Sequence, residues 1–316
     1  MRNAFLRVSH KEILIVAGEV SGDMHAAQLV RKIKDLDPAI HFFGIGGHKM
    51  REAGVEVIDD LTSYGTIGFI EILKFFLPVY LSFRSLCNLI EKRKPDLILC
   101  VDYQGFNMLL AGFAKKKRIP VVYYIAPQEW IWGTEEGAAA VLSSVDKVLT
   151  IFQKEDAYYR NVGQNVEYVG HPLLDIVKPA HTAEEYRQHL QVPTGRYIVS
   201  LFPGSRRQEI EKLFPIMLDT ADILKKEYPD MVFLLPISSP VFEDLIKKQL
   251  EKREIRVRLI PYEERYDALQ CSALTIAVSG TVTLEAAIME TPMVTFYKLS
   301  RWSYGIAKYL MKIKLR

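Results

Sequence analysis

The residues best suited to chemistry stand in short polar turns that directly follow apolar runs. The segment PGSRRQEI (203–210) combines a Pro-Gly turn, a serine and an arginine. The guanidinium of Arg206 can bind a phosphate through two N–H donors at once. A helix capped by Ser205 would add free N–H groups and the positive end of its dipole. We therefore predict a phosphate site at Gly204, Ser205 and Arg206; the alternative is an ordinary helix cap followed by surface arginines.

A second small-residue turn, SGTVTLE (279–285), follows the apolar run LTIAV. Gly280 allows a ligand to approach the backbone closely, and Ser279 or Thr281 can cap a helix that carries Glu285. A carboxylate in that place can accept hydrogen bonds from the two vicinal hydroxyls of a ribose. Alternatively, Glu285 only complements the helix dipole. Together with the PGSR segment in the same half of the chain, the pattern favours a nucleotide site.

An aspartate follows an apolar run in the first half of the chain, in VDYQGFN (101–107). Asp102 should therefore lie at the carboxyl edge of a sheet, where ligands bind in open α/β folds. A carboxylate partly removed from water there can have a raised pKa and act as a general base. The alternative is that Asp102 caps a helix near 104–117.

The segment GEVSGDMHAA (18–27) is a small-residue turn that opens a helix. It lacks the GxGxxG spacing of dinucleotide-binding proteins, so a dehydrogenase is not favoured. Glu19 and Asp23 are its candidate polar contacts to a ligand.

Two tryptophans and a glutamine follow the run VVYYIA, in APQEWIWG (126–133). Their alternate spacing would place Trp130 and Trp132 on the same side of an extended segment. With Gln128, they would form a stacking or sugar-binding wall. The alternative is that both rings fill the core.

The chain offers no convincing metal site. The DLD sequence at 35–37 ends a helix directly before Pro38 instead of following a strand, and the seven histidines show no HxxxH or HExxH spacing. His171 stands at the junction between the two halves, and His25 is expected to fill the start of a helix. We predict that the protein uses no metal or other cofactor.

Around these turns, short β-branched runs alternate with amphipathic stretches. Parallel strands need a covering connection, so the alternation predicts an α/β fold with doubly wound sheets. The scheme occurs twice, and YVGHPLLDIVKPAHT (168–182) separates the halves. We expect two Rossmann-like domains, residues 1–172 and 173–316, with a ligand cleft between them. The expected strands are 12–17, 41–47, 96–102, 121–126, 147–152, 197–202, 231–236, 257–260, 274–278 and 293–297.

The segment TIGFIEILKFFLPVYLSFRSL (66–86) is unusually apolar. Apolar side chains cover more of this predicted helix than one contact with the core can bury. The remaining apolar side chains should therefore face a membrane surface or a partner. A helix buried between neighbours is the alternative, and Pro78 is expected to break the segment in two. One narrow polar stripe is expected from Glu71, Lys74, Pro78, Ser82 and Ser85. The expected membrane contacts are Phe69, Phe75, Phe76, Val79 and Tyr80.

The composition is that of a globular protein and excludes several classes. Apolar residues make up 49% of the 316 residues and charged residues 25%, which rules out a disordered or fibrous chain. The net charge of +3 is too small to imply nucleic acid. The three cysteines form no CxxC pair, which favours a reducing compartment. We expect no signal peptide and no membrane span. The basic, aromatic segment 301–316 could touch anionic lipid heads or form a plain amphipathic helix.

Taken together and in this order, these segments resemble the lipid-A-disaccharide synthases. The resemblance rests on GEVSGD, the apolar segment, VDYQGFN, APQEWIWG, VGHPLLD, LFPGSRRQE and SGTVTLE, and runs from about Glu12 to the end. It implies the two-domain GT-B fold, with an acceptor-binding, membrane-facing first domain and a second domain that binds the UDP-sugar. The implied reaction joins UDP-2,3-diacylglucosamine to 2,3-diacylglucosamine 1-phosphate (lipid X) and releases UDP. It implies peripheral attachment to the cytoplasmic face of the membrane, without a metal, and leaves a homodimer open.

The resemblance also assigns roles to residues. Asp102 matches the family's essential aspartate and would be the general base, and Arg206 would lie near the diphosphate of the donor. The uridine nucleotide would be held by Ser279, Gly280, Thr281 and Glu285. The acceptor side would be lined by Glu19, Ser21, Gly22, Asp23, Gln128 and Trp130.

The sequence departs from the family pattern in three places. The basic residues that often follow the tryptophan motif in the family are absent from GTEEGAAA (133–140). Ala26 stands where the family commonly has a glycine, and the LPN and AGR elements that follow the region of Arg316 in the family are not present. The resemblance therefore implies an incomplete nucleotide domain. Two rival interpretations remain: a UDP-sugar 2-epimerase of the same fold, which needs no acyl-binding surface, and a non-catalytic lipid-binding protein.

Overall fold

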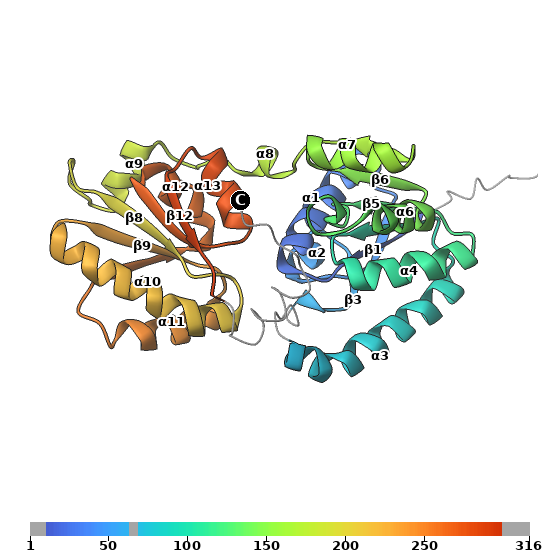
Figure 1. The fold of residues 1–316 in the computed structure, drawn as a ribbon, viewed down its shortest axis with the longest axis horizontal. Helices are drawn as coiled ribbons and strands as arrows, with labels where there is room; N and C mark the ends of the chain where they lie inside the picture. Colours follow the sequence, from blue (N-terminus) through green and yellow to red (C-terminus); the bar gives the residue numbers. More distant parts are fainter. Residues whose placement is uncertain (1–10, 63–68, 299–316) are drawn as a thin grey trace, which may run out of the picture. The chain divides into compact units, whose positions relative to one another are not determined.

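The computed structural model describes residues 11–62 and 69–298, and the side chains in these ranges except those of 69–76 and 132. It divides into two compact units, and the division falls between Pro172 and Leu173 (Figure 1). Each unit is built around its own parallel sheet.

The first unit holds a seven-stranded sheet in the order β3-β2-β1-β4-β5-β6-β7. All neighbouring strands are parallel, and the chain leaves β1 first towards one edge and later towards the other, as in a doubly wound sheet. The strands are β1 (Glu12–Ala17), β2 (His41–Ile45), β3 (Glu56–Asp59), β4 (Leu97–Val101), β5 (Val121–Tyr124), β6 (Lys147–Thr150) and β7 (Val166–Tyr168).

Helices cover both faces of this sheet. Alternate residues of β1 point to opposite faces, so Leu14 and Val16 belong to one apolar cluster and Ile13 and Ile15 to another. The burial of both faces explains why the sequence shows continuous apolar runs. The helices are α1 (Val20–Leu36), α2 (His48–Glu52), α3 (Phe69–Arg93), α4 (Gln104–Lys116), α5 (Glu129–Trp132), α6 (Glu135–Ser144) and α7 (Gln153–Val162).

The second unit holds a five-stranded parallel sheet in the order β10-β9-β8-β11-β12. Its strands are β8 (Ile198–Phe202), β9 (Val232–Ile237), β10 (Val257–Pro261), β11 (Leu274–Val278) and β12 (Met293–Phe296). Its helices are α8 (Leu173–Ile176), α9 (Ala183–His189), α10 (Arg207–Glu227), α11 (Glu243–Leu250), α12 (Arg265–Cys271) and α13 (Thr281–Ile288), with two short 3-10 helices at Pro240–Phe242 and Tyr262–Glu264.

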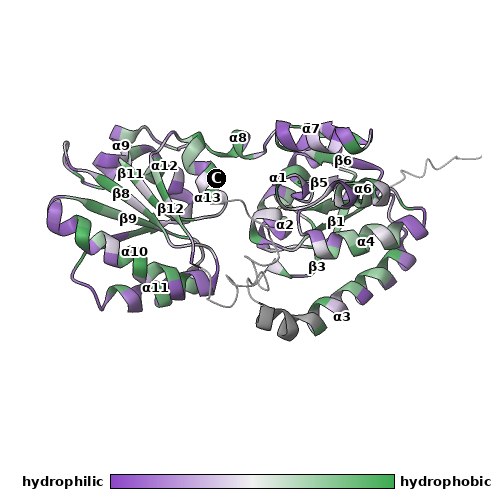
Figure 2. Cartoon of the chain, viewed as in Figure 1, coloured by the Kyte–Doolittle hydropathy of each residue, from purple (hydrophilic) through white to green (hydrophobic). Residues whose placement is uncertain are grey.

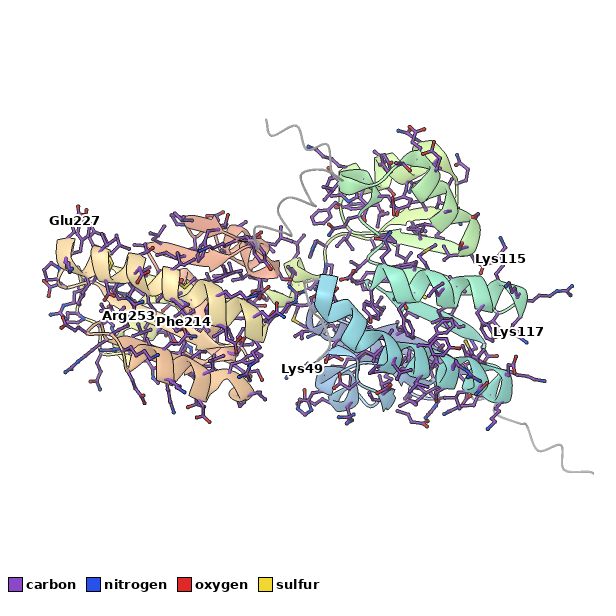
Figure 3. All side chains as sticks on the ribbon, turned by 60° about the horizontal axis from the view of Figure 1, so that its bottom comes forward. Lys49, Lys115, Lys117, Phe214, Glu227 and Arg253 are labelled. Carbon is purple, nitrogen blue, oxygen red and sulfur yellow. The ribbon has the colours of Figure 1, made fainter. Side chains whose placement is uncertain are left out.

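Helix α10 shows how the sequence positions these elements. Hydrophobic and hydrophilic residues alternate turn by turn along it (Figure 2). Ile210, Leu213, Phe214 and Met217 recur at helical spacing and are buried against β8 and β9 (Figure 3). The helix follows the PGSR turn, so its packing fixes where that turn lies.

Two strands of the first sheet are absent from the sequence prediction. Strand β3 is only four residues long and mostly exposed, and β7 has three residues of which only Val166 is buried. Short, polar strands at the two edges of a sheet carry no apolar run, so the sequence gives no signal for them.

Helix α3 corrects the interpretation of the apolar segment. It runs without a break from Phe69 to Arg93, through Pro78, so the predicted division at the proline is wrong. Its buried residues Ser82, Leu86 and Ile90 lie one turn apart, and their packing offsets the hydrogen bond that the proline lacks. Lys117, labelled in Figure 3, is the C-cap residue of the neighbouring helix α4. It forms an ion pair with Glu91 of α3 at 2.6 Å.

The predicted polar stripe of α3 is also wrong in part, because Ser82 faces the core. Among the predicted membrane contacts, Val79 packs against the core and Tyr80 is exposed. The side chains of Phe69, Phe75 and Phe76 lie outside the described part, as does the segment 301–316. Within the described ranges, none of the helices is long and apolar enough to cross a membrane.

Candidate functional site

The first sheet changes direction between β1 and β4, and this is where open α/β sheets bind ligands. Ala17 and Val101 are paired at the ends of these strands. The residues that follow them, Gly18 and Asp102, therefore lie side by side at the carboxyl edge. The structure thus brings the GEVSGD and VDYQGFN segments together, as the sequence predicts.

Asp102 lies in a tight turn with an unusual backbone. Its φ is 51° and that of Tyr103 is 52°, so two successive non-glycine residues adopt the left-handed conformation. The N-cap of α4 is Tyr103, so the alternative interpretation of Asp102 as the helix cap is wrong. Such strain persists only where the surroundings impose it, and it is concentrated at functional sites.

Two buried side chains impose this conformation. The amide Nδ2 of Asn107 donates to the carbonyl oxygens of Asp102 at 2.7 Å, Val101 at 3.3 Å and Val16 at 3.4 Å. The hydroxyl of Tyr123 donates to the carbonyl of Asp102 at 2.7 Å. The turn is therefore held through its backbone, and the half-buried side chain of Asp102 projects from a fixed position. Neither Asn107 nor Tyr123 was predicted to have a role from the sequence.

The GEVSGD turn packs closely against this aspartate. A Cβ atom on Gly22 would lie 3.8 Å from the Cβ of Asp102, and one on Gly18 would clash with the ring of Tyr103 at 2.2 Å. Close approach therefore requires a glycine at position 18, whereas a Cβ on Gly22 would make only ordinary van der Waals contacts. Glu19 is the N-cap residue of α1, and both Glu19 and Ser21 are half-buried beside the turn.

Asp23 has a different role from the one predicted. Its carboxylate accepts hydrogen bonds from the backbone N–H groups of Gly47 at 2.7 Å, Lys49 at 3.0 Å and Met50 at 3.1 Å. The side chain is 4% exposed, and burial raises its pKa. Asp23 therefore caps the start of α2, so the prediction that it contacts the acceptor is corrected to a structural role.

The tryptophan segment is a single helical turn, so the predicted extended conformation is wrong. Gln128 is the N-cap residue of α5 and is exposed. The ring of Trp130 lies 5.8 Å from that of Phe152, which lies 5.0 Å from His171. Within the described residues, the buried Nε1 of Trp130 has no hydrogen-bond partner. The side chain of Trp132 lies outside the described part.

A histidine pair extends this group of rings. The rings of His25 and His171 meet edge to face at 6.1 Å. Burial, with a smaller effect from His171, lowers the pKa of His25 to about 4, and burial lowers the pKa of His171. His25 is therefore neutral near pH 7 and offers a binding group no positive charge.

The second sheet changes direction between β8 and β11, and both of its predicted turns lie there. Phe202 and Ala277 are paired near the strand ends. The PGSR turn and the SGT turn therefore start from adjacent strands, as a shared nucleotide site requires.

The PGSR turn differs from the prediction in its capping. The N-cap residue of α10 is Arg206, not Ser205, and the capping carboxylate comes from Glu209. One oxygen of Glu209 accepts the N–H groups of Ser205 at 3.0 Å and Arg206 at 3.2 Å, and the other accepts Nη1 of Arg206 at 3.0 Å. Two of the N–H groups at this helix start, those of Ser205 and Arg206, are therefore taken.

The SGT turn also lacks the predicted side-chain cap. The N-cap residue of α13 is Gly280, and its carbonyl oxygen accepts the hydroxyl of Thr283 at 2.7 Å. Ser279 and Gly280 are exposed, and Thr281 is half-buried. The turn is open to a ligand, but neither Ser279 nor Thr281 caps the helix.

Glu285 is 2% exposed and belongs to a buried cluster of side chains. Its Oε1 accepts hydrogen bonds from the hydroxyl of Tyr266 at 2.9 Å and from Nε of Arg265 at 3.3 Å. The guanidinium of Arg265 also stacks over the rings of Tyr262 and Tyr266. Glu285 therefore does more than complement the helix dipole, and its contact with a ribose stays a prediction.

Two doubly wound parallel units, each with polar turns at its change of direction, are the architecture of the GT-B fold class. Among solved structures, the chain is similar to UDP-GlcNAc 2-epimerase from Neisseria meningitidis bound to UDP-GlcNAc, with a TM-score of 0.64, 15% identity, and coverage of 94% of this chain and 85% of that chain. It is also similar to HepE from Anabaena in complex with UDP and glucose, with a TM-score of 0.51, 16% identity, and coverage of 90% and 80%. These likenesses show the fold.

The sequence comparisons give the family. The lipid-A-disaccharide synthetase family model matches residues 13–316. The lipid-A-disaccharide synthase of Geobacter sulfurreducens is 42% identical over 96% of this chain and 79% of its own length. Lipid-A-disaccharide synthase 1 of Legionella pneumophila (strain Paris) is 38% identical over 96% and 78%. The chain belongs to the lipid-A-disaccharide synthase family and is a hexosyltransferase.

Proposed function

We propose that this protein transfers 2,3-diacylglucosamine from UDP to the 6-hydroxyl of 2,3-diacylglucosamine 1-phosphate. The products are a β(1→6)-linked disaccharide 1-phosphate and UDP. The observation that carries the proposal is the carboxylate of Asp102, held on a strained turn where the first sheet changes direction. The family membership of the chain supports the substrates.

In this mechanism the first unit binds the acceptor and activates it. Asp102 accepts the proton of the acceptor hydroxyl while the oxygen attacks the anomeric carbon from the side opposite the UDP, so the configuration inverts. General base catalysis of this kind contributes about 10²–10⁴-fold to the rate. Glu19, Ser21, Gly22, Gln128 and Trp130 are proposed to line the acceptor position.

The second unit binds the donor and stabilises the leaving UDP. Arg206 is proposed to contact the diphosphate, where a cation 4 Å from a phosphate charge contributes about 4 kcal/mol at an intermediate dielectric, before desolvation. The guanidinium thus supplies positive charge to the leaving group in the transition state, without a metal ion. Ser279, Gly280, Thr281 and Glu285 are proposed to hold the uridine and its ribose.

A membrane surface is proposed to meet α3, on the cytoplasmic side. Leu77, Tyr80 and Leu81 lie within two turns of α3 and are 61%, 45% and 54% exposed, with Arg84 exposed one turn further on. Apolar side chains beside a cation suit the boundary between acyl chains and anionic head groups. The acyl chains of both substrates make such contact useful, because the substrates themselves reside in a bilayer.

The base assignment is tested by a turnover assay with the two lipid substrates. Asp102→Asn should lower kcat at least a hundredfold and leave UDP affinity unchanged, because the amide cannot accept the proton. Asp96→Asn is the matched control. Asp96 precedes the same strand, and its carboxylate accepts the N–H of Glu12 at the amino ends of the strands, away from Asp102. Turnover by the Asp102 variant at the rate of the control would remove Asp102 from the mechanism.

The membrane contact is tested by sedimentation with vesicles that contain anionic lipid. The double substitution Leu77→Ser and Leu81→Ser should lower the bound fraction several-fold. The control is Ile223→Ser with Val241→Ser, which removes similarly exposed apolar side chains, 65% and 77%, from the second unit. Equal binding by the two double variants would show that α3 does not contact the membrane.

A further inference from the structure

The carboxylate of Glu209 is more buried than the charged side chains of Arg206, Arg207 and Glu211 beside it at the start of α10. It is 6% exposed, and its two oxygens accept three hydrogen bonds: two from backbone N–H groups and one from the guanidinium of Arg206. An anion at the N-terminus of a helix is favourable, and here the chain supplies its own. A ligand phosphate therefore cannot use the N–H groups of Ser205 and Arg206 while Glu209 holds them.

Gly204, in the same turn, lies directly against the carboxylate of Glu209. Gly204 has a φ of 106°, and a Cβ atom there would lie 2.3 Å from Oε2 of Glu209 and 2.8 Å from its Cβ. Ser238, which follows β9, donates from its hydroxyl to the carbonyl of Gly204 at 3.3 Å. The backbone thus closes tightly around Glu209, and the carboxylate has one position.

The ion pair of Glu209 with Arg206 is unequal in exposure. The side chain of Glu209 is 7% exposed, whereas that of Arg206 is 34% exposed. The carboxylate therefore holds the guanidinium from its buried side, through Nη1, while part of the arginine side chain reaches the surface. A guanidinium is planar and rigid, so holding one nitrogen restricts the directions of its other N–H groups.

We propose that Glu209 is a positioning residue for the donor: it orients the Arg206 guanidinium towards the diphosphate of a nucleoside diphosphate sugar. This rests on the proposed function, in which Arg206 contacts the donor phosphates. A long side chain that is already immobilised loses less freedom on binding, and the difference for one such side chain corresponds to about a tenfold change in affinity.

The test is a calorimetric measurement of UDP affinity. Glu209→Gln keeps the size of the side chain and an oxygen for the backbone N–H groups but loses the charge that holds Arg206; we expect about tenfold weaker binding. Glu211→Gln is the matched control, because Glu211 pairs with the neighbouring Arg207 at 2.8 Å on the same helix. It should change the affinity less than twofold. Unchanged affinity in the Glu209 variant would overturn the proposal.

A double-mutant cycle separates positioning from general support of the fold. In an Arg206→Ala background, Glu209→Gln should weaken UDP binding no further, since the group that it orients is gone. An undiminished further loss in that background would overturn the positioning role. Arg206→Ala that itself left UDP affinity unchanged would instead refute the phosphate contact of the proposed function.

UDP affinity of Arg206→Lys is a further test. This variant keeps the hydrogen bonds from the backbone N–H groups of residues 205 and 206 to Glu209. A lysine keeps the positive charge but cannot reproduce the planar arrangement of N–H groups. If orientation matters, UDP binding by this variant should be almost as weak as with alanine. Binding close to that of the unmodified protein would show that charge alone suffices and would overturn the proposal.

Discussion

The helices that follow β6 and β8 begin in the same way. Before α7, Glu155 accepts the backbone N–H groups of Ile151 at 2.8 Å and Phe152 at 3.2 Å. Before α10, the carboxylate of Glu209 binds the corresponding pair of N–H groups. Both carboxylates are buried, at 1% and 6% exposure. One helix in each unit thus begins with this pair of hydrogen bonds to a buried glutamate.

The two helix starts differ in the N-cap residue, which is Phe152 in one and Arg206 in the other. The ring of Phe152 packs between those of Trp130 and His171. At this helix start the N-cap side chain therefore contributes to packing. Burial is the largest effect on Glu155, and it raises the pKa of this carboxyl to about 7. The comparison indicates that the N-cap residue decides what the glutamate does. With phenylalanine at the N-cap the glutamate only caps the helix, and with arginine it also binds a cation.

The largest expected effect is the pH dependence of stability that Glu155 causes. Its pKa in the folded state, about 7, lies above the ordinary 4.5, so the folded protein binds the proton more tightly. Its contribution to stability is therefore complete below pH 4.5 and is lost as the pH rises through 7. At 1.36 kcal/mol per pKa unit, the loss is about 3 kcal/mol.

Denaturant unfolding of the protein and of Glu155→Gln at several pH values checks this expectation. Glutamine mimics the protonated carboxyl at every pH, so the variant should gain about 3 kcal/mol relative to the protein between pH 4.5 and 8. A difference that stays constant over this range would show that Glu155 is not perturbed by its burial.

Much of the fold could be predicted from local patterns. The apolar runs gave the strands β1 and β11 with their observed bounds, because strands buried on both faces have to be apolar throughout. A helix was predicted directly after the PGSR turn, and α10 begins there. The charged edge strands β3 and β7 were missed because their pairing partners, not their own residues, make them strands.

A site residue could be predicted only where its role follows from residues close to it in the sequence. Asp102 was found because it follows a buried strand. The roles of Asn107 and Tyr123 depend on hydrogen bonds to a turn that they reach only in the folded chain. Asp23 was misassigned for the same reason, since its amide partners lie 24 to 27 residues away. A buried polar contact between distant segments leaves no periodic signal.

A second, smaller effect is expected from the glycine that distinguishes the α10 start. Gly204→Ala places a methyl group against the carboxylate of Glu209 and forces alanine into a left-handed conformation. We expect a loss of about 2 kcal/mol in the free energy of unfolding, with weaker UDP binding. Gly112→Ala in α4, with open space at its Cβ, should be stabilising by about 0.5–1 kcal/mol. Equal changes for the two variants would show that Glu209 can move away at little cost.

The smallest effect is expected from Arg207, the neighbour of Arg206 in the sequence. Arg207 is 69% exposed and pairs only one turn along the helix, with Glu211, so no buried group fixes it. Arg207→Ala should change the free energy of unfolding by less than about 0.5 kcal/mol, as for other exposed pairs. UDP affinity, measured by calorimetry beside Arg206→Ala, should change less than twofold. If both alanine variants lost the same affinity, the two arginines would act through their summed charge, and the N-cap position would not explain the difference between α10 and α7.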